Sequence, residues 1–214
     1  MSEPAWKIEK RRLVASYREA NRTVVKGQSV FAGSSLMEMF PVHLWAQELG
    51  PDAPRVYNRG VGGWRTEEML TCLKEMVIDL QPRRVFINIG TNDLSDAAVT
   101  IDALIGRYED ILTRIEGAVP GVEIVVMAYY PINYDAADES MKACLRIRTN
   151  ERICEANRAV ETMAHRRGHR FINVNEPLTD LQGRLKTEYT IEGMHIKEAG
   201  YRAIWPLVKE EVLR

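Results

Sequence analysis

Cysteine is scarce in this chain of 214 residues, which contains only Cys72, Cys144 and Cys154. The three include no Cys-x-x-Cys pair, and an odd number of cysteines does not pair up completely. This count argues against both a disulfide framework and a zinc ribbon. We therefore expect three reduced thiols, which are typical of a cytoplasmic protein.

The sequence also has no long apolar run and no excess of charge of one sign. No segment approaches the roughly 18 apolar residues that a membrane-spanning helix needs, and the charged N-terminus lacks the apolar centre of a secretory signal. Lys and Arg together number 29 against 30 for Asp and Glu, which gives a net charge of −1. Proteins that bind nucleic-acid phosphates usually have a clear basic excess, so we do not expect nucleic acid as a partner. The lack of a long apolar run likewise argues against membrane insertion.

Low-complexity tracts, internal repeats and flexible linkers are absent as well. A chain of this length with 45% hydrophobic residues has enough apolar material for one substantial core. We therefore expect residues 1–214 to form a single domain. Residues 1–22 are expected to supply an N-terminal helix, over 5–20, that packs on this domain or at an oligomer interface such as that of a homodimer.

Short apolar runs alternate along the chain with segments of helical periodicity. We expect strands at 29–32, 55–58, 84–89, 123–128 and 170–174, and helices near 66–79, 98–117, 150–167 and 197–213. The nearly continuous apolar run at 85–89 is typical of a strand that is covered on both faces. The alternation predicts an α/β fold, a three-layer α/β/α sandwich with a parallel sheet of about five strands. The segment 131–147 has no clear period, and we expect it to be a long loop near the site.

Ligands bind beyond the carboxyl ends of the strands in an open parallel sheet, so the residues that follow the strands are the first candidates for a site. These segments are 33–36 (GSSL), 58–63 (NRGVGG) and 90–93 (GTND), and a fourth, 190–195 (TIEGMH), precedes the last helix. Together they offer a serine hydroxyl, glycine N–H groups, a side-chain amide, and a carboxylate close to an imidazole. Such groups are the parts of an acyl-transfer site.

In this order, the four segments resemble the sequence blocks of the SGNH hydrolases, also called GDSL-type esterases and lipases, which include lysophospholipase-like and acetylhydrolase-like members. The resemblance runs from about residue 29 to residue 202. It implies a flavodoxin-like fold, with Ser35 as the nucleophile, His195 as the base and Glu192 as the acid that orients the base. It also implies an oxyanion hole made of the Ser35 and Gly63 N–H groups and the Asn92 amide, and no metal or organic cofactor.

Two positions depart from the pattern of that family. Ser34 stands where the first block has an aspartate, which removes a carboxylate that helps to hold the local turn but no catalytic group. Glu192 stands where the last block has an aspartate, which lengthens the side chain by one methylene. The acid of a triad accepts the imidazole N–H and thereby fixes the tautomer of the ring, and we expect Glu192 to do this for His195. A backbone carbonyl is an alternative acceptor.

The hypothesis that follows is a serine esterase that hydrolyses short-chain acyl esters, acetyl esters foremost, through an acyl-enzyme. The apolar and aromatic side chains expected to line the substrate pockets are Leu36, Trp64, Tyr129, Tyr130 and Met194. No long hydrophobic lid insertion is visible, which favours short acyl groups on a soluble alcohol. A lysophospholipase or acyl thioesterase of the same fold is the alternative among enzymes. A catalytically silent, flavodoxin-like binding module is the alternative from another class.

Other motifs give less support. Arg65 stands where a dinucleotide-binding G-x-G-x-x-G needs its third glycine, and Met37 breaks the G-x-S-x-G pattern of the α/β-hydrolases. His165 and His169 have helical spacing but no carboxylate to complete a metal site, so no metal is expected. Asp93 is expected to bond to neighbouring backbone rather than to act in the chemistry.

Overall fold

Five parallel strands form one sheet in the order β2-β1-β3-β4-β5 in the computed structural model, which describes residues 4–214. The strands are β1 (Ser29–Gly33), β2 (Val56–Gly60), β3 (Arg84–Asn88), β4 (Glu123–Met127) and β5 (Arg170–Ile172). This order is that of the flavodoxin-like, doubly wound α/β fold. The predicted fold class and the number of strands are therefore confirmed.

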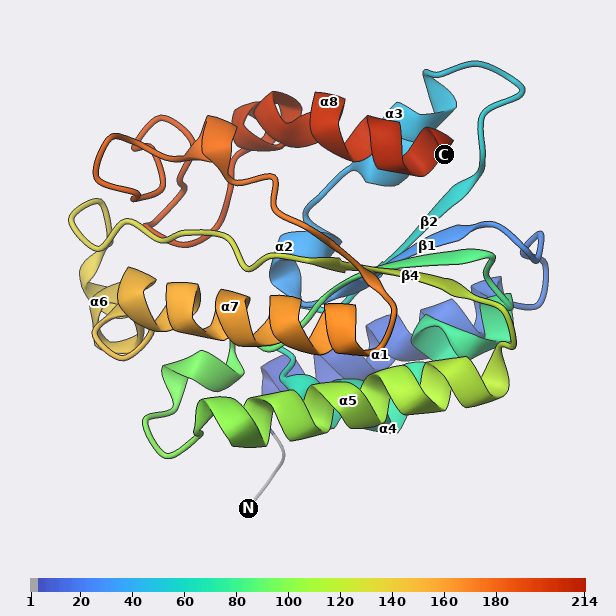
Figure 1. Cartoon of the computed structure of the whole chain (residues 1–214), viewed down its shortest axis with the longest axis horizontal. Helices are drawn as coiled ribbons and strands as arrows, with labels where there is room; N and C mark the ends of the chain where they lie inside the picture. Colours follow the sequence, from blue (N-terminus) through green and yellow to red (C-terminus); the bar gives the residue numbers. More distant parts are fainter. Residues whose placement is uncertain (1–3) are drawn as a thin grey trace.

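Helices cover both faces of the sheet. They are α1 (Ala5–Ala20), α2 (Ser35–Glu38), α3 (Val42–Gln47), α4 (Thr66–Met76), α5 (Ile101–Ala118), α6 (Glu139–Leu145), α7 (Asn150–Arg166) and α8 (Glu198–Leu213), with 3₁₀ turns η1 (Ile78–Leu80), η2 (Asp93–Ser95) and η3 (Glu176–Leu178). Figure 1 shows α3 and α8 above the sheet and α1, α4, α5 and α7 below it, so the molecule has three layers. Within residues 4–214, no helix is both long enough and apolar enough to cross a membrane.

The side chains of β3 explain why this strand appears as one apolar run in the sequence. Val85 and Ile87 pack into the core on the side of α4, α5 and α7, whereas Phe86 packs into the core on the side of α3 and α8. All three are fully buried, and the Phe86 ring stacks on that of Phe31 with centroids 4.3 Å apart. Burying such a side chain contributes about 1.5–3 kcal/mol, so the central strands anchor both layers.

The helix α1 packs on the rest of the domain. Val14 is buried, and the Tyr17 hydroxyl donates a 2.7 Å hydrogen bond to the carbonyl of Gly60 at the end of β2. Arg18 pairs with the largely buried carboxylate of Glu75 in α4 at 2.5 Å. The predicted helix over 5–20 is thus present, and residues 1–3 of the predicted segment 1–22 lie outside the described residues.

The segment 131–147 is not the continuous loop that the sequence predicts, because it contains α6. The Asp138 carboxylate caps this helix by accepting the Met141 N–H at 2.9 Å. With seven residues, α6 is too short to show a helical period, and the same holds for α2 and α3. At the edge of the sheet, β5 ends at Ile172, two residues earlier than expected, and the Asn175 side chain beyond it donates to the Tyr129 carbonyl.

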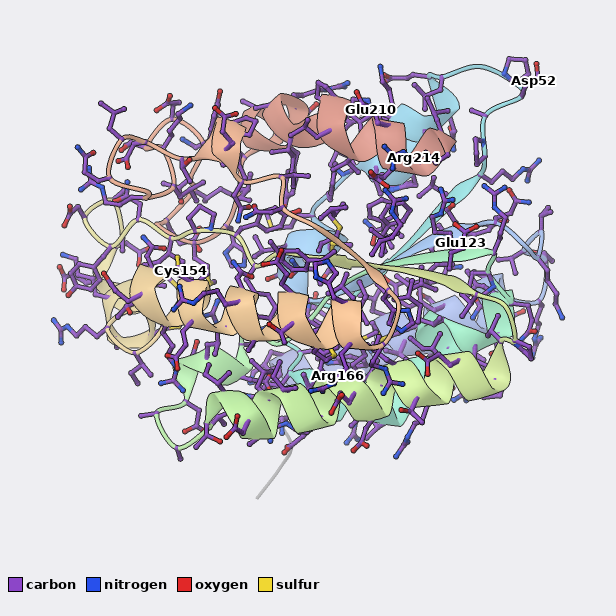
Figure 2. All side chains as sticks on the ribbon, in the orientation of Figure 1. Asp52, Glu123, Cys154, Arg166, Glu210 and Arg214 are labelled. Atoms are coloured by element: carbon purple, nitrogen blue, oxygen red, sulfur yellow. The ribbon has the colours of Figure 1, made fainter. Side chains whose placement is uncertain are left out.

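Figure 2 labels several charged side chains that are exposed, among them Asp52, Glu210 and Arg214. On α7, Arg166 reaches across to Glu109 of α5 and pairs with it at 2.6 Å. Cys154, labelled on the same helix in Figure 2, is exposed, and Cys72 and Cys144 are partly buried. All three are free thiols.

Candidate active site

The sheet order brings the segments after β1, β2 and β3 to one edge. Gly33, the last residue of β1, is in register with Gly60 of β2 and Asn88 of β3. Because these strands are parallel, the chain leaves all three at the same end, where Ser35 begins α2 and Asn92 precedes η2. The site thus lies at the switch between β1 and β3, where sheets of this order bind ligands.

Three side chains form a continuous line of hydrogen bonds at this edge. The Ser35 hydroxyl lies 2.9 Å from Nε2 of His195, and Nδ1 of the same ring lies 2.5 Å from Oε1 of Glu192. Ser35 and His195 are both partly exposed, whereas the neighbouring Ser34 is buried. In this arrangement the imidazole can take a proton from the serine while the carboxylate holds the opposite ring nitrogen. The structure therefore brings together the three residues that the sequence suggests.

The loop that carries Glu192 and His195 is held by contacts at Gly193. Gly193 between them has φ +96°, and a Cβ there would lie 2.7 Å from the Asn133 carbonyl, so glycine is required on both counts. The Asn133 N–H donates to the Gly193 carbonyl at 2.7 Å, and the Gly193 N–H donates to the Thr190 hydroxyl at 2.8 Å. The segment after β4 thus fixes the position of the histidine loop.

The glycine turn after β2 lies against the first turn of α2. Glu38, three residues after Ser35, accepts the Gly62 N–H with one carboxylate oxygen, and Lys10 of α1 pairs with that carboxylate at 3.2 Å. The next residue, Gly63, is exposed. Across residues 4–214, the N–H groups of Ser35 and Gly63 have no hydrogen-bond partner. Both are therefore available to a bound oxyanion.

The Asn92 side chain is held by two neighbours. Its Nδ2 donates to the Trp64 carbonyl at 2.8 Å, and its Oδ1 accepts a 2.7 Å hydrogen bond from Nη2 of Arg148. A primary amide has two N–H donors, so one of them is not used by Trp64. Because Asn92 is partly exposed, this second N–H can serve a ligand at the sheet edge.

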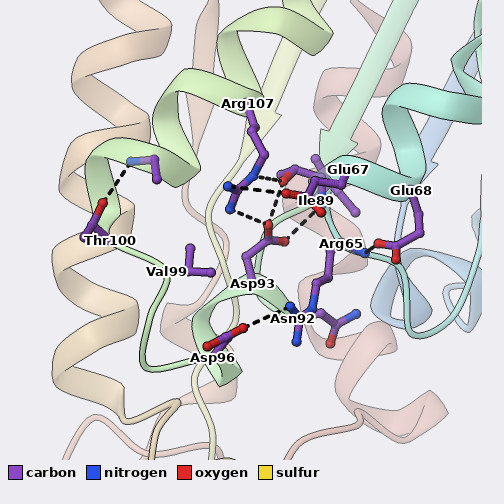
Figure 3. A network of polar contacts seen from close by, with 12 residues as sticks. Arg65, Glu67, Glu68, Ile89, Asn92, Asp93, Asp96, Val99, Thr100 and Arg107 are labelled. Carbon is purple, nitrogen blue, oxygen red and sulfur yellow. Dashed lines mark hydrogen bonds and ion pairs between the residues drawn. The ribbon is translucent and has the colours of Figure 1, made fainter.

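Asp93 ties the start of α4 to the turn after β3. Its buried carboxylate accepts the Thr66 N–H at 3.0 Å and the Thr66 hydroxyl at 2.6 Å. Arg107 of α5 completes the network with a 3.1 Å bond to the same carboxylate, as Figure 3 shows. Arg65, beside it in Figure 3, pairs with Asp96 at 3.3 Å. The side chain of Asp93 does bond to backbone, but to the N–H of Thr66, 27 residues earlier in the chain, and not to the residues that follow it as the sequence suggests.

The side chains expected to line the substrate pockets are all buried, at 0–7% exposure: Leu36, Trp64, Tyr129, Tyr130 and Met194. Tyr129 and Tyr130 are the most deeply buried of the five, at 0% and 1% exposure, although Tyr129 also lines a cavity beside α7 and β5. Their role as pocket residues beside Ser35 stays a prediction. The Tyr129 hydroxyl donates to the Ile89 carbonyl at 2.8 Å, and burial raises the pKa of Tyr130 well above its ordinary value. These two residues come two and three positions after the end of β4 and pack in the core.

Three charged residues beside the site were not found in the sequence, namely Lys10, Glu38 and Arg148. Glu38 follows the serine by three residues on α2, which is a local signal, although the helix itself is too short to be predicted. Arg148 lies between α6 and α7, and nothing in the sequence distinguishes it from the exposed Arg146 two residues earlier. Only the fold brings it to the site, where it contacts Asn92, 56 residues away in the chain.

The described residues contain no group of three or more His, Cys, Asp or Glu side chains that is arranged to hold a metal ion. A cavity of about 590 Å³ lies between α3 and β2, and one of about 600 Å³ lies beside α7 and β5. Neither is lined by Ser35 or His195. The line of hydrogen bonds is therefore separate from both cavities.

Comparison with known proteins bears directly on this geometry. Residues 13–203 match the sequence profile of the GDSL-like lipase/acylhydrolase family. A search of curated protein sequences gave no match. A solved structure from Streptococcus pneumonia, provisionally described as a platelet activating factor, is 30% identical with a TM-score of 0.84, and the alignment covers 97% of this chain and 94% of the other.

More distant structures share the fold. A GDSL-like lipase from Bacteroides thetaiotaomicron is 21% identical with a TM-score of 0.76, over 93% of this chain and 96% of the other. A catalytic mutant of an acetylxylan esterase from Geobacillus stearothermophilus is 17% identical with a TM-score of 0.65, over 88% and 95%. With the profile match over most of its length and a serine and histidine in contact at the edge of the sheet, the chain belongs to the GDSL-like lipase/acylhydrolase family and is a carboxylic ester hydrolase.

Proposed function

We propose that this protein is a serine esterase that uses Ser35, His195 and Glu192 as a catalytic triad. The observation that carries the proposal is the unbroken line of hydrogen bonds from the serine hydroxyl through the imidazole to the carboxylate. Glu192 takes the place of the usual aspartate because its extra methylene still lets Oε1 reach Nδ1 of the ring. A carboxylate, rather than a backbone carbonyl, is the acceptor here.

In the first half of the reaction, Nε2 of His195 takes the proton of Ser35 as its Oγ attacks the ester carbonyl. The tetrahedral oxyanion accepts hydrogen bonds from the N–H groups of Ser35 and Gly63 and from the open N–H of Asn92. When the intermediate collapses, the C–O bond to the alcohol breaks, and the imidazolium returns its proton to the leaving oxygen. The product of this half is an acyl-enzyme on Ser35.

Hydrolysis of the acyl-enzyme repeats these steps with water as the nucleophile. His195 takes a proton from the water, the same three donors hold the second oxyanion, and Ser35 regains its proton as the acid leaves. Glu192 stabilises the imidazolium in both halves. Losing one donor of such an oxyanion hole typically costs about 10²–10³ in kcat.

We infer that the acyl group is short, with acetyl as the first candidate. Leu36, Trp64 and Met194 are packed into the core around the sheet edge and leave the nucleophile partly exposed. The helices and strands use most of the chain, and the cavities of about 590 and 600 Å³ lie elsewhere. Little apolar surface is thus free to surround a long acyl chain.

Substitution of the serine tests the nucleophile. Ser35→Ala should abolish both the hydrolysis of p-nitrophenyl acetate and labelling by a fluorophosphonate, because only an activated serine reacts quickly with that probe. Ser34→Ala is the matched control, since this hydroxyl is buried and directly precedes the nucleophile in the chain. Loss of activity in Ser34→Ala, with activity kept in Ser35→Ala, would reverse the assignment.

A series of p-nitrophenyl esters tests the acyl preference. A site with a real acyl channel gains about 0.8 kcal/mol, or roughly fourfold in affinity, for each methylene that it buries. We expect instead that kcat/KM is highest between acetyl and butyryl and falls for longer chains. An optimum at eight carbons or more would contradict the short-acyl proposal and would support a lysophospholipase.

A further inference from the structure

Arg148 is a buried arginine directly behind the candidate site. Only 3% of it is exposed, and it lies in the turn between α6 and α7. Its guanidinium donates to Oδ1 of Asn92 at 2.7 Å, to the Ser95 hydroxyl at 2.8 Å and to the sulfur of Met194. Across residues 4–214, no carboxylate forms an ion pair with it.

This environment is unusual for an arginine. Buried charged side chains are nearly always paired, because removal from water disfavours the charged form. Burial accordingly lowers the pKa of Arg148, but an arginine keeps its proton at neutral pH. The three partners are neutral groups, and two of them, Asn92 and Met194, lie in the segments that carry the candidate oxyanion donor and the histidine. The surroundings of Arg148 thus indicate a role in the candidate site rather than in stabilising the fold.

The hydrogen bond from Arg148 determines which way the Asn92 amide faces. A guanidinium can only donate, so the atom next to it must be the amide oxygen. On the other side, the Trp64 carbonyl can only accept, so the atom next to it must be the amide nitrogen. A flipped amide would set donor against donor and acceptor against acceptor. The second N–H of Asn92 is therefore fixed in its direction before any substrate binds.

We propose that Arg148 is a positioning residue for the oxyanion hole, which holds the Asn92 amide in its donating orientation and places behind it a positive charge that no ion pair neutralises. This inference rests on the proposed function. The charge pulls electron density toward the amide oxygen and makes the N–H a stronger donor to the oxyanion. Because negative charge appears on that oxygen only during the reaction, Arg148 should act on kcat and leave KM nearly unchanged.

The test is the kinetics of Arg148→Met on p-nitrophenyl acetate. Methionine has similar length but neither charge nor donors, and because Arg148 has no ion-pair partner in residues 4–214 its removal leaves no buried charge behind. We expect kcat to fall about 10–100-fold, below the limit set by loss of the donor itself, with KM within twofold. Arg146→Met is the matched control, because Arg146 is exposed and its guanidinium bonds to the Tyr134 hydroxyl rather than to Asn92. Its kcat should equal that of the wild type.

A double-mutant cycle separates an action through Asn92 from a general effect on the fold. With Asn92→Ala already in place, Arg148→Met should cost less than a further twofold in kcat, because the group that it positions is gone. An equal further loss in that background, or a wild-type kcat in the single variant, would overturn the proposal.

Arg148→Lys provides a second route if the methionine variant does not fold. Lysine keeps the charge but lacks the planar guanidinium, whose several N–H groups reach Asn92 and Ser95 together. We therefore expect kcat to fall about fivefold or more. An unchanged kcat would overturn the proposal. Ser35→Ala in the same assay distinguishes failure of the proposed function from failure of the inference about Arg148. An active Ser35→Ala variant contradicts the proposed function, whereas an inactive one beside a fully active Arg148→Met variant contradicts this inference alone.

Discussion

Replacing Glu192 by glutamine isolates the charge of the acid in the proposed triad. Glutamine has the same shape, and its carbonyl oxygen can still accept the Nδ1–H of His195 where Oε1 now lies at 2.5 Å. The ring should therefore stay in place in Glu192→Gln. What disappears is the negative charge that stabilises the imidazolium formed in each half of the reaction.

The size of the effect follows from the geometry of the pair. The side chains of Glu192 and His195 are 15% and 25% exposed, an intermediate environment for which an effective dielectric constant of about 20 is appropriate. Two unit charges about 4 Å apart then attract each other by about 4 kcal/mol. At roughly 1.4 kcal/mol for each factor of ten, kcat should fall about 10³-fold in Glu192→Gln, with little change in Tm.

Glu192→Asp gives a second point on the same scale. Removing one methylene withdraws the carboxylate by about 1.5 Å, beyond hydrogen-bond distance of Nδ1, but keeps its charge nearby. The calculated attraction falls from about 4 to about 3 kcal/mol, so a loss of roughly fivefold in kcat is expected. The order of activity should thus be wild type, Glu192→Asp and Glu192→Gln.

The assay is kcat and kcat/KM on p-nitrophenyl acetate, with thermal melting to confirm that each variant is folded. Glu188→Gln is the control, because Glu188 is exposed and near Glu192 in the chain. A Glu192→Gln variant that keeps activity within threefold of the wild type would refute the charge argument. The site would then be a serine–histidine dyad in which the carboxylate only packs beside the ring.

The remaining predictions concern stability. Asp93→Ala removes the buried carboxylate that accepts the Thr66 N–H, so the free energy of unfolding in urea should fall by about 3–5 kcal/mol. Asp110→Ala is the control, because Asp110 is exposed, and it should change this free energy by less than about 0.5 kcal/mol. Equal effects would contradict this. Burial and the charge of Arg59 lower the pKa of His43, so its stabilising contribution is present above about pH 6.5 and is lost as the pH falls through the lower folded pKa. His43→Gln should therefore flatten the acid-side decline in Tm, and parallel Tm profiles would refute this. Gly193→Ala, at φ +96°, should lower Tm and activity together, and an unchanged Tm would show that the loop adapts.

Much of this fold is visible in the sequence because its signals are local. The central strand β3 is apolar at every position from 85 to 87, since successive side chains enter cores on opposite faces of the sheet. The long helices α5 and α7 show their period over 18 and 17 residues. Helices of four to seven residues, such as α2 and α6, complete too few turns to show one.

In the candidate site, too, residues with a local sequence signal could be predicted and the others could not. The proposed nucleophile Ser35 and the amide of Asn92 come two and four residues after the ends of β1 and β3, so a rule about strand ends finds them. The same rule also selects Tyr129 and Tyr130, both of which the structure buries, because the chain after β4 stays inside the protein. There the Asn157 side chain bonds to both the N–H and the carbonyl of Tyr129, as a neighbouring strand would. Arg148 fails the rule altogether, because its partners come together only in the folded protein.

Three charged side chains surround the proposed oxyanion donors, and each of them bonds to a neutral group of the site. Glu38 holds the Gly62 N–H, Asp93 holds the Thr66 N–H at the end of the same glycine turn, and Arg148 holds the Asn92 amide. Charge-assisted hydrogen bonds are about twice as strong as neutral ones, so they fix loops that have little regular structure of their own. An oxyanion hole accelerates a reaction only if its donors are already in place when the charge develops. The ion pairs of Glu38 with Lys10 and of Asp93 with Arg107 balance two of the three charges. Within residues 4–214 the charge of Arg148 behind Asn92 has no such ion pair, and it lies where the proposed reaction would supply negative charge.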